Sequence, residues 1–116
     1  MRVYIPVTAV DVKRFLETGT LATSEVFEVN QEFINENLEL NQEECEYLRS
    51  LDAAQASLVD SDRGLILALE LEKSATPKPA DIDCLFSCTY GEDGEIELTW
   101  FGASEIEHQL PQWLAQ

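Results

Sequence analysis

Two alternating segments on either side of a short turn constrain the fold of this chain most strongly. Cys84–Tyr90 alternates between two sides, as does Ile96–Trp100, and the residues between them are Gly91-Glu92-Asp93-Gly94. Alternation places successive side chains on opposite faces of a strand, and a glycine-bounded connection of this length is typical of a hairpin. The pattern therefore predicts a β-hairpin, and with it a sheet.

Further strands are predicted from the same period of two. Leucines recur at every second position from Leu65 to Leu71, which gives that strand an apolar face. Arg2–Val7 alternates with its valines and isoleucine on one side, and Ser24–Val29 is a short segment that includes β-favouring residues. Ser74–Asp83 contains two prolines and is predicted to be a loop.

Capping residues mark the expected helices. A side-chain oxygen at the N-cap accepts a hydrogen bond from a free amide of the first turn, and a glycine often ends the helix. Thr8 with Asp11 is expected to begin a helix that runs through Glu17 and stops at Gly19. Asn30 is expected to cap a helix over Gln31–Asn37, and Asn41 a longer one from Gln42 to about Val59. Ser104 with Glu107 is expected to begin a last helix, which Pro111 breaks or restarts.

The order of elements is then β-α-(β)-α-α-β-β-β-α. Strands that each show one apolar face predict a sheet covered on one side by helices. We expect an α+β fold, a two-layer sandwich with a mixed, mostly antiparallel sheet of about four to five strands and helices on one face. With 116 residues, the chain is expected to form a single domain over residues 1–116.

The charge pattern limits the possible partners. The net charge is -16, and the nine glutamates between Phe15 and Leu48 are not interrupted by any lysine or arginine. Such a surface repels phosphate backbones and anionic lipids, so nucleic acid and membrane surfaces are excluded as ordinary partners. A basic protein partner or a cation stays possible, as does a purely solubilising role.

The cysteines and the apolar segments indicate a cytoplasmic protein. No stretch reaches the ~20 apolar residues that span a bilayer, and the N-terminus lacks a signal-peptide pattern. Cys45, Cys84 and Cys88 have no disulfide spacing, because Cys84 and Cys88 on one strand would lie ~13 Å apart. All three are expected to be buried and reduced.

The sequence provides little for catalysis. His108 is the only histidine, and no motif for a cofactor, a phosphate or a nucleophile elbow is present, so no cofactor is expected. Asp60 and Asp62 are better explained by turn chemistry than by a calcium loop, because the spacing to Gly64 is wrong. Carboxylates near strand ends could still form a weak divalent-cation site; they are Asp81, Asp83, Glu92 and Asp93.

Two segments carry a resemblance to a known family. Met1-Arg2-Val3-Tyr4-Ile5-Pro6-Val7-Thr8 and the stretch from Glu43 to Leu58 resemble small uncharacterised actinobacterial proteins, which open with a strand of this type and carry a Glu-rich segment leading into a Tyr- and Ala-containing helix. The resemblance covers about residues 1–60. It differs at Val7, where the family usually has Ala, and at Cys45, where an aliphatic residue is common. The resemblance implies a bacterial cytoplasmic protein and no particular chemistry.

The resemblance also directs attention to a possible groove between the first strand and the long helix. Tyr4 and Tyr47 could form its rim, with Thr8 and Asp52 nearby. The alternative is that Tyr47 belongs to the core, Thr8 is a helix cap and Asp52 is an exposed helix residue.

Three functional hypotheses follow. The first is a non-enzymatic interaction or regulatory module whose acidic face binds a basic partner, or whose sheet edge pairs two copies in a homodimer. The second is a small enzyme that uses clustered carboxylates with a divalent cation. The third is a mimic of nucleic acid with carboxylates in place of phosphates.

Overall fold

The computed structural model describes residues 1–22, 25–72 and 75–116. Its elements follow the predicted order. In chain order they are β1 (Arg2–Val7), α1 (Ala9–Thr18), β2 (Phe27–Glu28), α2 (Gln31–Glu36), α3 (Gln42–Ser57), β3 (Arg63–Glu70), β4 (Ile82–Tyr90), β5 (Ile96–Gly102) and α4 (Ile106–Leu114), with 3-10 turns at Pro79–Asp81 and Ala103–Glu105.

The strands form one open sheet in the order β2-β1-β3-β4-β5, with every neighbouring pair antiparallel. The predicted hairpin is β4–β5. It closes with a hydrogen bond from Gly91 N to Glu95 O of 2.8 Å, and Gly94 takes a positive φ of 81° that favours glycine. The α+β class and the mostly antiparallel character are confirmed, but the described strands contain no parallel pair, so the sheet is antiparallel throughout and not mixed.

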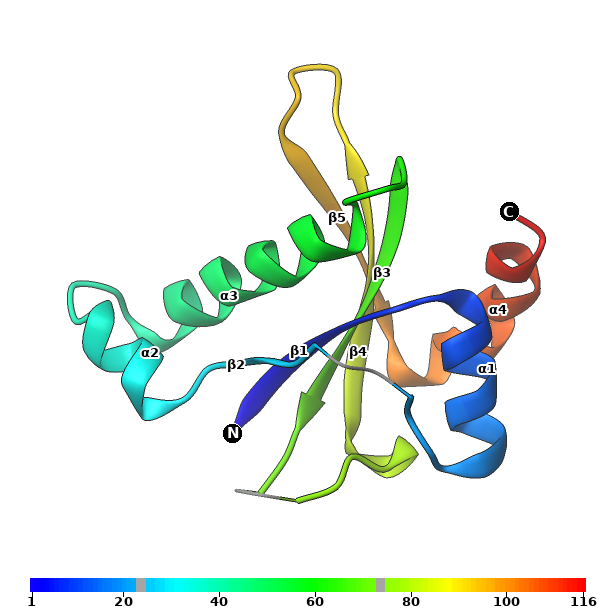
Figure 1. Ribbon diagram of the computed structural model, residues 1–116, viewed down its shortest axis with the longest axis horizontal. Helices are drawn as coiled ribbons and strands as arrows, with labels where there is room; N and C mark the ends of the chain where they lie inside the picture. The colour runs from blue at the N-terminus through cyan, green and yellow to red at the C-terminus, as the bar shows by residue number, and fades with distance from the viewer. Residues whose placement is uncertain (23–24, 73–74) are drawn as a thin grey trace.

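Helices cover both faces of the sheet, which corrects the expectation of helices on one face. Figure 1 shows α3 on one side of the sheet and α1 with α4 on the other. One core contains Val3, Ile5, Leu67 and Leu69 with Phe15 of α1 and Trp113 of α4, and the other contains Tyr4, Ile66, Ala68, Cys84 and Cys88 with Ala53 and Ala54 of α3. The reason lies in β3, because Ile66 and Ala68 between its leucines are also apolar and fully buried.

The predicted caps hold the helix starts. Thr8 and Asp11 form a capping box for α1, and Asn41 forms one with Glu44 for α3. Asn30 accepts a hydrogen bond from Phe33 N at 2.9 Å and begins α2. Gly19 follows α1 in the left-handed conformation, with φ 76°. These are local interactions, and the sequence was sufficient to predict them.

The C-terminal region differs from the expectation. The Glu105 carboxylate accepts a hydrogen bond from Gly102 N at 3.1 Å, so the predicted pair of Ser104 and Glu107 is not the cap. α4 continues through Pro111 without a break. Because Ile106 and Trp113 are buried at its two ends, packing offsets the missing hydrogen bond at the proline.

Two other boundaries moved. β2 is reduced to Phe27–Glu28, and Ser24, where a strand was expected to begin, lies outside the described residues. In the described part of the predicted loop Ser74–Asp83, a 3-10 turn precedes β4, which begins at Ile82. Ser74 also lies outside the described residues.

Candidate functional site

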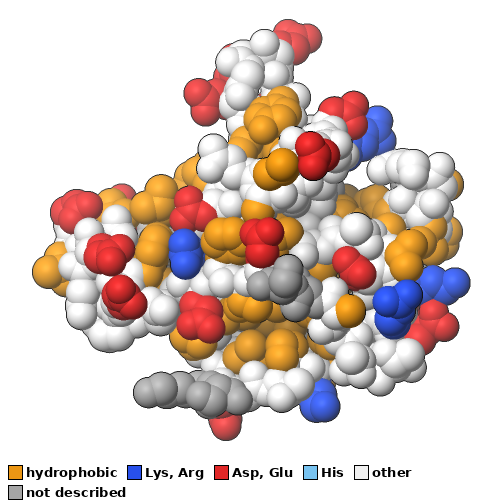
Figure 2. Space-filling model, in the orientation of Figure 1, with side chains coloured by type: hydrophobic (Ala, Val, Ile, Leu, Met, Phe, Trp, Pro, Cys, Tyr) orange, Lys and Arg blue, Asp and Glu red, His pale blue; other side chains and the backbone are white. Residues whose placement is uncertain are grey.

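An acidic arm, defined here as residues 31–48, combines α2, a short connection and the first turns of α3. It contains six glutamates and no lysine or arginine. All of these glutamates except the half-buried Glu46 are exposed. Figure 1 shows this part of the chain extending away from the sheet, and Figure 2 shows acidic side chains distributed over it. Glu43 and Glu44 lie in the first turn of α3, where the helix dipole favours negative charge.

Arg49 attaches the arm to the sheet. Its Nε donates to Glu28 O at 3.0 Å, and its guanidinium carbon lies 5.2 Å from the ring centre of Phe27 and 4.9 Å from that of Phe33. Its Nη1 also pairs with Asp52 at 3.1 Å. The guanidinium therefore joins β2, α2 and α3, and its hydrogen bonds are used for this structural role.

A shallow apolar groove lies on the arm and is called the docking groove here. Its volume is about 430 Å³, and its residues are Leu40, Glu43, Glu44, Tyr47 and Leu48. Tyr47 keeps 60% of its surface exposed, and Leu38, also on the arm, keeps 75%, which are large values for such side chains. The arrangement places an apolar surface between carboxylates.

The four residues that were expected to share a groove do not lie together in the structure. They are Tyr4, Thr8, Tyr47 and Asp52. Tyr47 lines the docking groove, whereas Thr8 caps α1 and lines a different, larger pocket. Tyr4 is buried in the core beneath α3, and Asp52 pairs with Arg49. The expected packing of the first strand against the long helix is present, but of the four residues only Tyr47 reaches the docking groove.

Tyr4 belongs to a cluster around Arg2. Arg2 Nε donates to the Tyr4 hydroxyl at 3.4 Å, and Nη1 pairs with Asp83 at 2.7 Å and Glu70 at 3.4 Å. Burial raises the pKa of Tyr4, against the lowering effect of Arg2. For Arg2, burial lowers the pKa, but the hydrogen bonds to Tyr4 and Asp83 oppose this and the pKa is raised in total. The ion pairs of Arg2 with Asp83 and Glu70 join β1 to β4 and β3.

The three cysteines are free and buried, as expected. Burial raises the pKa of the Cys84 thiol, and it raises the pKa of the Cys88 thiol to about 11. A nucleophilic cysteine needs an accessible thiolate, so Cys84 and Cys88 serve packing.

Three of the four carboxylates near strand ends perform local structural roles. Asp81 accepts from Lys78 N at 2.9 Å, Asp93 accepts from Glu95 N at 3.0 Å, and Asp83 pairs with Arg2. In the parts of the chain that the structure describes, no three side chains of the metal-binding types gather into a possible ion site. His108 is exposed on α4. This geometry gives no support to the hypothesis of a carboxylate-metal enzyme.

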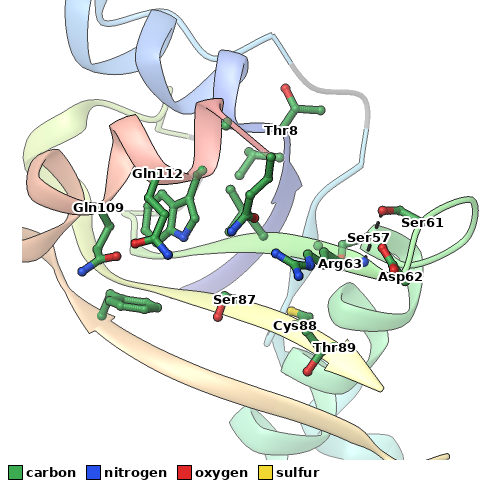
Figure 3. A pocket seen from close by; sticks show the side chains of 17 residues that line it. Thr8, Ser57, Ser61, Asp62, Arg63, Ser87, Cys88, Thr89, Gln109 and Gln112 are labelled. Atoms are coloured by element: carbon green, nitrogen blue, oxygen red, sulfur yellow. Dashed lines mark hydrogen bonds between the residues drawn. The ribbon is translucent and has the colours of Figure 1, made fainter. Parts of the chain in front are cut away.

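The larger pocket was not anticipated from the sequence. It has a volume of about 560 Å³ and lies where the end of β1, the start of β3, the end of β4 and the helix α4 meet (Figure 3). Its residues come from segments far apart in the chain, and none of these segments carries a sequence motif for a binding site. The sequence offered only polar side chains near strand ends as an indication of this pocket, and such side chains occur in many proteins without a pocket.

Comparison with known proteins finds a family model that matches most of the chain. The sequence model of a family of unknown function, DUF6912, matches residues 1–87, a longer stretch than the first 60 residues on which the resemblance was based. No curated protein and no solved structure matches the chain. Within the described residues, every helix is too short or too polar to cross a membrane.

Proposed function

The chain belongs to the family of unknown function DUF6912, and for this member we propose a non-enzymatic interaction or regulatory module whose docking groove binds a basic, amphipathic segment of a partner protein. The resemblance to actinobacterial proteins favours the bacterial cytoplasm as the compartment. The proposal rests on one observation: exposed apolar side chains of α3 lie between carboxylates on an arm without a lysine or arginine.

The chemistry of the groove selects the partner. Tyr47 and Leu48 offer apolar surface to Leu, Ile or Phe side chains, and Glu43 and Glu44 offer carboxylates to Lys or Arg. A helix with apolar residues at i, i+3, i+4 and i+7 and basic residues beside them satisfies both requirements. The net charge of -16 also accelerates the encounter with a basic segment and opposes an acidic one.

A designed peptide tests the proposal directly. The probe is a synthetic Leu/Lys peptide with its leucines on one helical face, compared with a scrambled peptide of the same composition and with a Leu/Glu analogue. Fluorescence anisotropy at low and high salt gives each dissociation constant. We expect the amphipathic Leu/Lys peptide to bind most tightly and to weaken as salt rises.

Variants assign the binding to the groove. Tyr47→Ala removes the exposed aromatic ring and is expected to weaken binding about tenfold, while Glu43→Gln weakens it severalfold and lowers its salt dependence. Tyr90→Ala and Glu17→Gln are matched controls, because these residues are exposed elsewhere. If the scrambled peptide binds as well, or if Tyr47→Ala binds like the wild type, the charge acts without a groove and the proposal is wrong.

A second copy of the chain is the other partner that an observation favours. β5 is a seven-residue edge strand, and Trp100 on it is 59% exposed. Pairing of two β5 edges about a twofold axis would cover this ring. Light scattering over a concentration series tests the dimer: Trp100→Lys should shift the chain to monomer while Leu114→Lys does not, and a wild type that is monomeric at every concentration excludes it.

A further inference from the structure

The larger pocket differs from the rest of this molecule in its charge. The chain carries 23 acidic side chains, yet among the described residues that line the pocket the charged side chains are only Asp62 and Arg63, which are of opposite sign. Asp62 and Arg63 are both exposed. The remaining polar residues are serines, threonines and glutamines. The pocket is therefore a neutral polar surface on a strongly acidic protein.

Several of these polar groups are available to a ligand. The side chains of Ser87, Thr89, Gln109 and Gln112 form no hydrogen bond with any other residue that the structure describes. Figure 3 shows that Gln109 and Gln112 come from α4, whereas Ser87 and Thr89 come from β4. Hydroxyl and carboxamide groups can each donate and accept. These protein groups therefore match ligand groups that both donate and accept hydrogen bonds, above all hydroxyls.

Apolar side chains form another part of the lining. Val7, Leu65, Phe101 and Trp113 contribute to the lining. The rings of Phe101 and Trp113 pack edge to face, with centres 5.2 Å apart and planes at 83°. The Trp113 side chain is almost fully buried, which holds this contact in place. A preformed apolar lining with a few polar groups around it is typical of sites for small molecules.

The side chains of the lining disfavour anions, metal ions and purely apolar molecules as ligands. An anion would find one guanidinium beside a carboxylate, within a field set by a net charge of -16. A metal ion would find one carboxylate and no histidine in the lining. A purely apolar ligand would cover the half-buried side chains of Ser87 and Gln109 and would offer them no hydrogen-bond partner.

We propose that this pocket binds a small, uncharged polyhydroxylated molecule of about the size of a monosaccharide or a cyclitol. The hydroxyls of the ligand would bond to Ser87, Thr89, Gln109 and Gln112, and its C–H face would lie on the apolar lining. The proposal goes beyond the docking groove and does not rest on it, because the two sites share no residue.

Titration followed by amide NMR tests the proposal. The probes are glucose, ribose and myo-inositol, with glucose 6-phosphate and glucosamine as charged counterparts. At least one neutral probe should shift the amide signals of residues 87–89 and 109–113 in a saturable way and raise the Tm. The charged counterparts should bind more weakly. Absence of any saturable shift with the neutral probes, or tighter binding of the phosphorylated sugar, would overturn the proposal.

Conservative variants locate the site. Gln112→Ala and Thr89→Val each remove one hydrogen-bonding group from an exposed position, so folding should be retained. Each is expected to weaken binding about threefold to tenfold. Gln55→Ala is the matched control, an exposed helical glutamine outside the pocket. Equal binding by all three variants would place the ligand elsewhere and reject the site.

Discussion

Gly64 at the start of β3 lies against Ser57 at the end of α3, so closely that a Cβ atom on Gly64 would stand 2.6 Å from the Cβ of Ser57 and would overlap its Oγ. The contact fixes where α3 leaves the sheet. Both residues also line the larger pocket. The absence of a side chain at one position thus sets the distance between a helix and the sheet beneath it.

The first prediction concerns this contact. Gly64→Ala should lower the free energy of unfolding by about 1–3 kcal/mol, because the backbone of α3 must move to accept the methyl group. Gly91→Ala is the control: there the added Cβ meets the carboxylate end of Glu97, which can rotate away. Urea denaturation measures both variants. Equal stability of Gly64→Ala and the wild type would contradict the close approach.

The second prediction concerns the attachment of the acidic arm. Arg49→Ala removes one hydrogen bond to Glu28 O and the stacking on Phe27 and Phe33, and it should cost about 2–3 kcal/mol. Arg49→Lys should recover only part of this, since an ammonium cannot reproduce the planar stacking.

Hydrogen exchange separates this local role from a general loss of stability. Amides of α2 should exchange faster in Arg49→Ala than in the wild type, relative to amides of β3 and β4. Asp52→Asn removes only the partly exposed ion pair and should cost less than about 1 kcal/mol. If α2 keeps its protection in Arg49→Ala, the arm is held by other contacts.

The third prediction is a loss of stability in alkaline solution. The pKa of the Cys88 thiol is raised from 9.0 to about 11 in the folded protein, so the neutral form is favoured by folding. This contribution is complete below about pH 9 and is lost as the pH rises toward 11. Burial also raises the pKa values of Cys84 and Tyr4, which act in the same direction.

Denaturation across this pH range gives the measurement. The free energy of unfolding should fall by up to about 2–3 kcal/mol through Cys88 alone. Cys88→Ala should show a smaller fall over the same range, although its stability near neutral pH is lower because a buried sulfur is lost. Identical pH dependence in the variant and the wild type would exclude Cys88 as a source.

Much of the fold was predictable because its signals are local. Thr8, Asn30 and Asn41 cap helices through hydrogen bonds to amides three residues away, and the alternation of 84–90 and 96–100 defines a hairpin. The last helix was predicted less well. Its start depends on Glu105, and its passage through Pro111 depends on the burial of Trp113 against Phe101.

The candidate sites were predictable only in part. The density of glutamates over residues 31–48 indicated an acidic surface, and Tyr47 was among the residues expected to line a groove. Nothing in the sequence shows that the half-buried Leu40 and the exposed Leu48 line the same groove as Tyr47. The larger pocket could not be predicted, because Thr8, Ser87 and Gln112 lie far apart in the chain and are joined only by the sheet and α4.

Local signals were enough to predict the order of the elements, the acidic surface and the burial of the cysteines, since these depend on periodicity, capping and composition. Which helix covers which face of the sheet depends on packing in three dimensions. Periodicity shows which side of a strand is apolar, but it does not show which element lies opposite. Ile66 and Ala68 face α3 while Leu67 and Leu69 face α1 and α4, and this division places Tyr4 in a core and leaves Tyr47 on the surface.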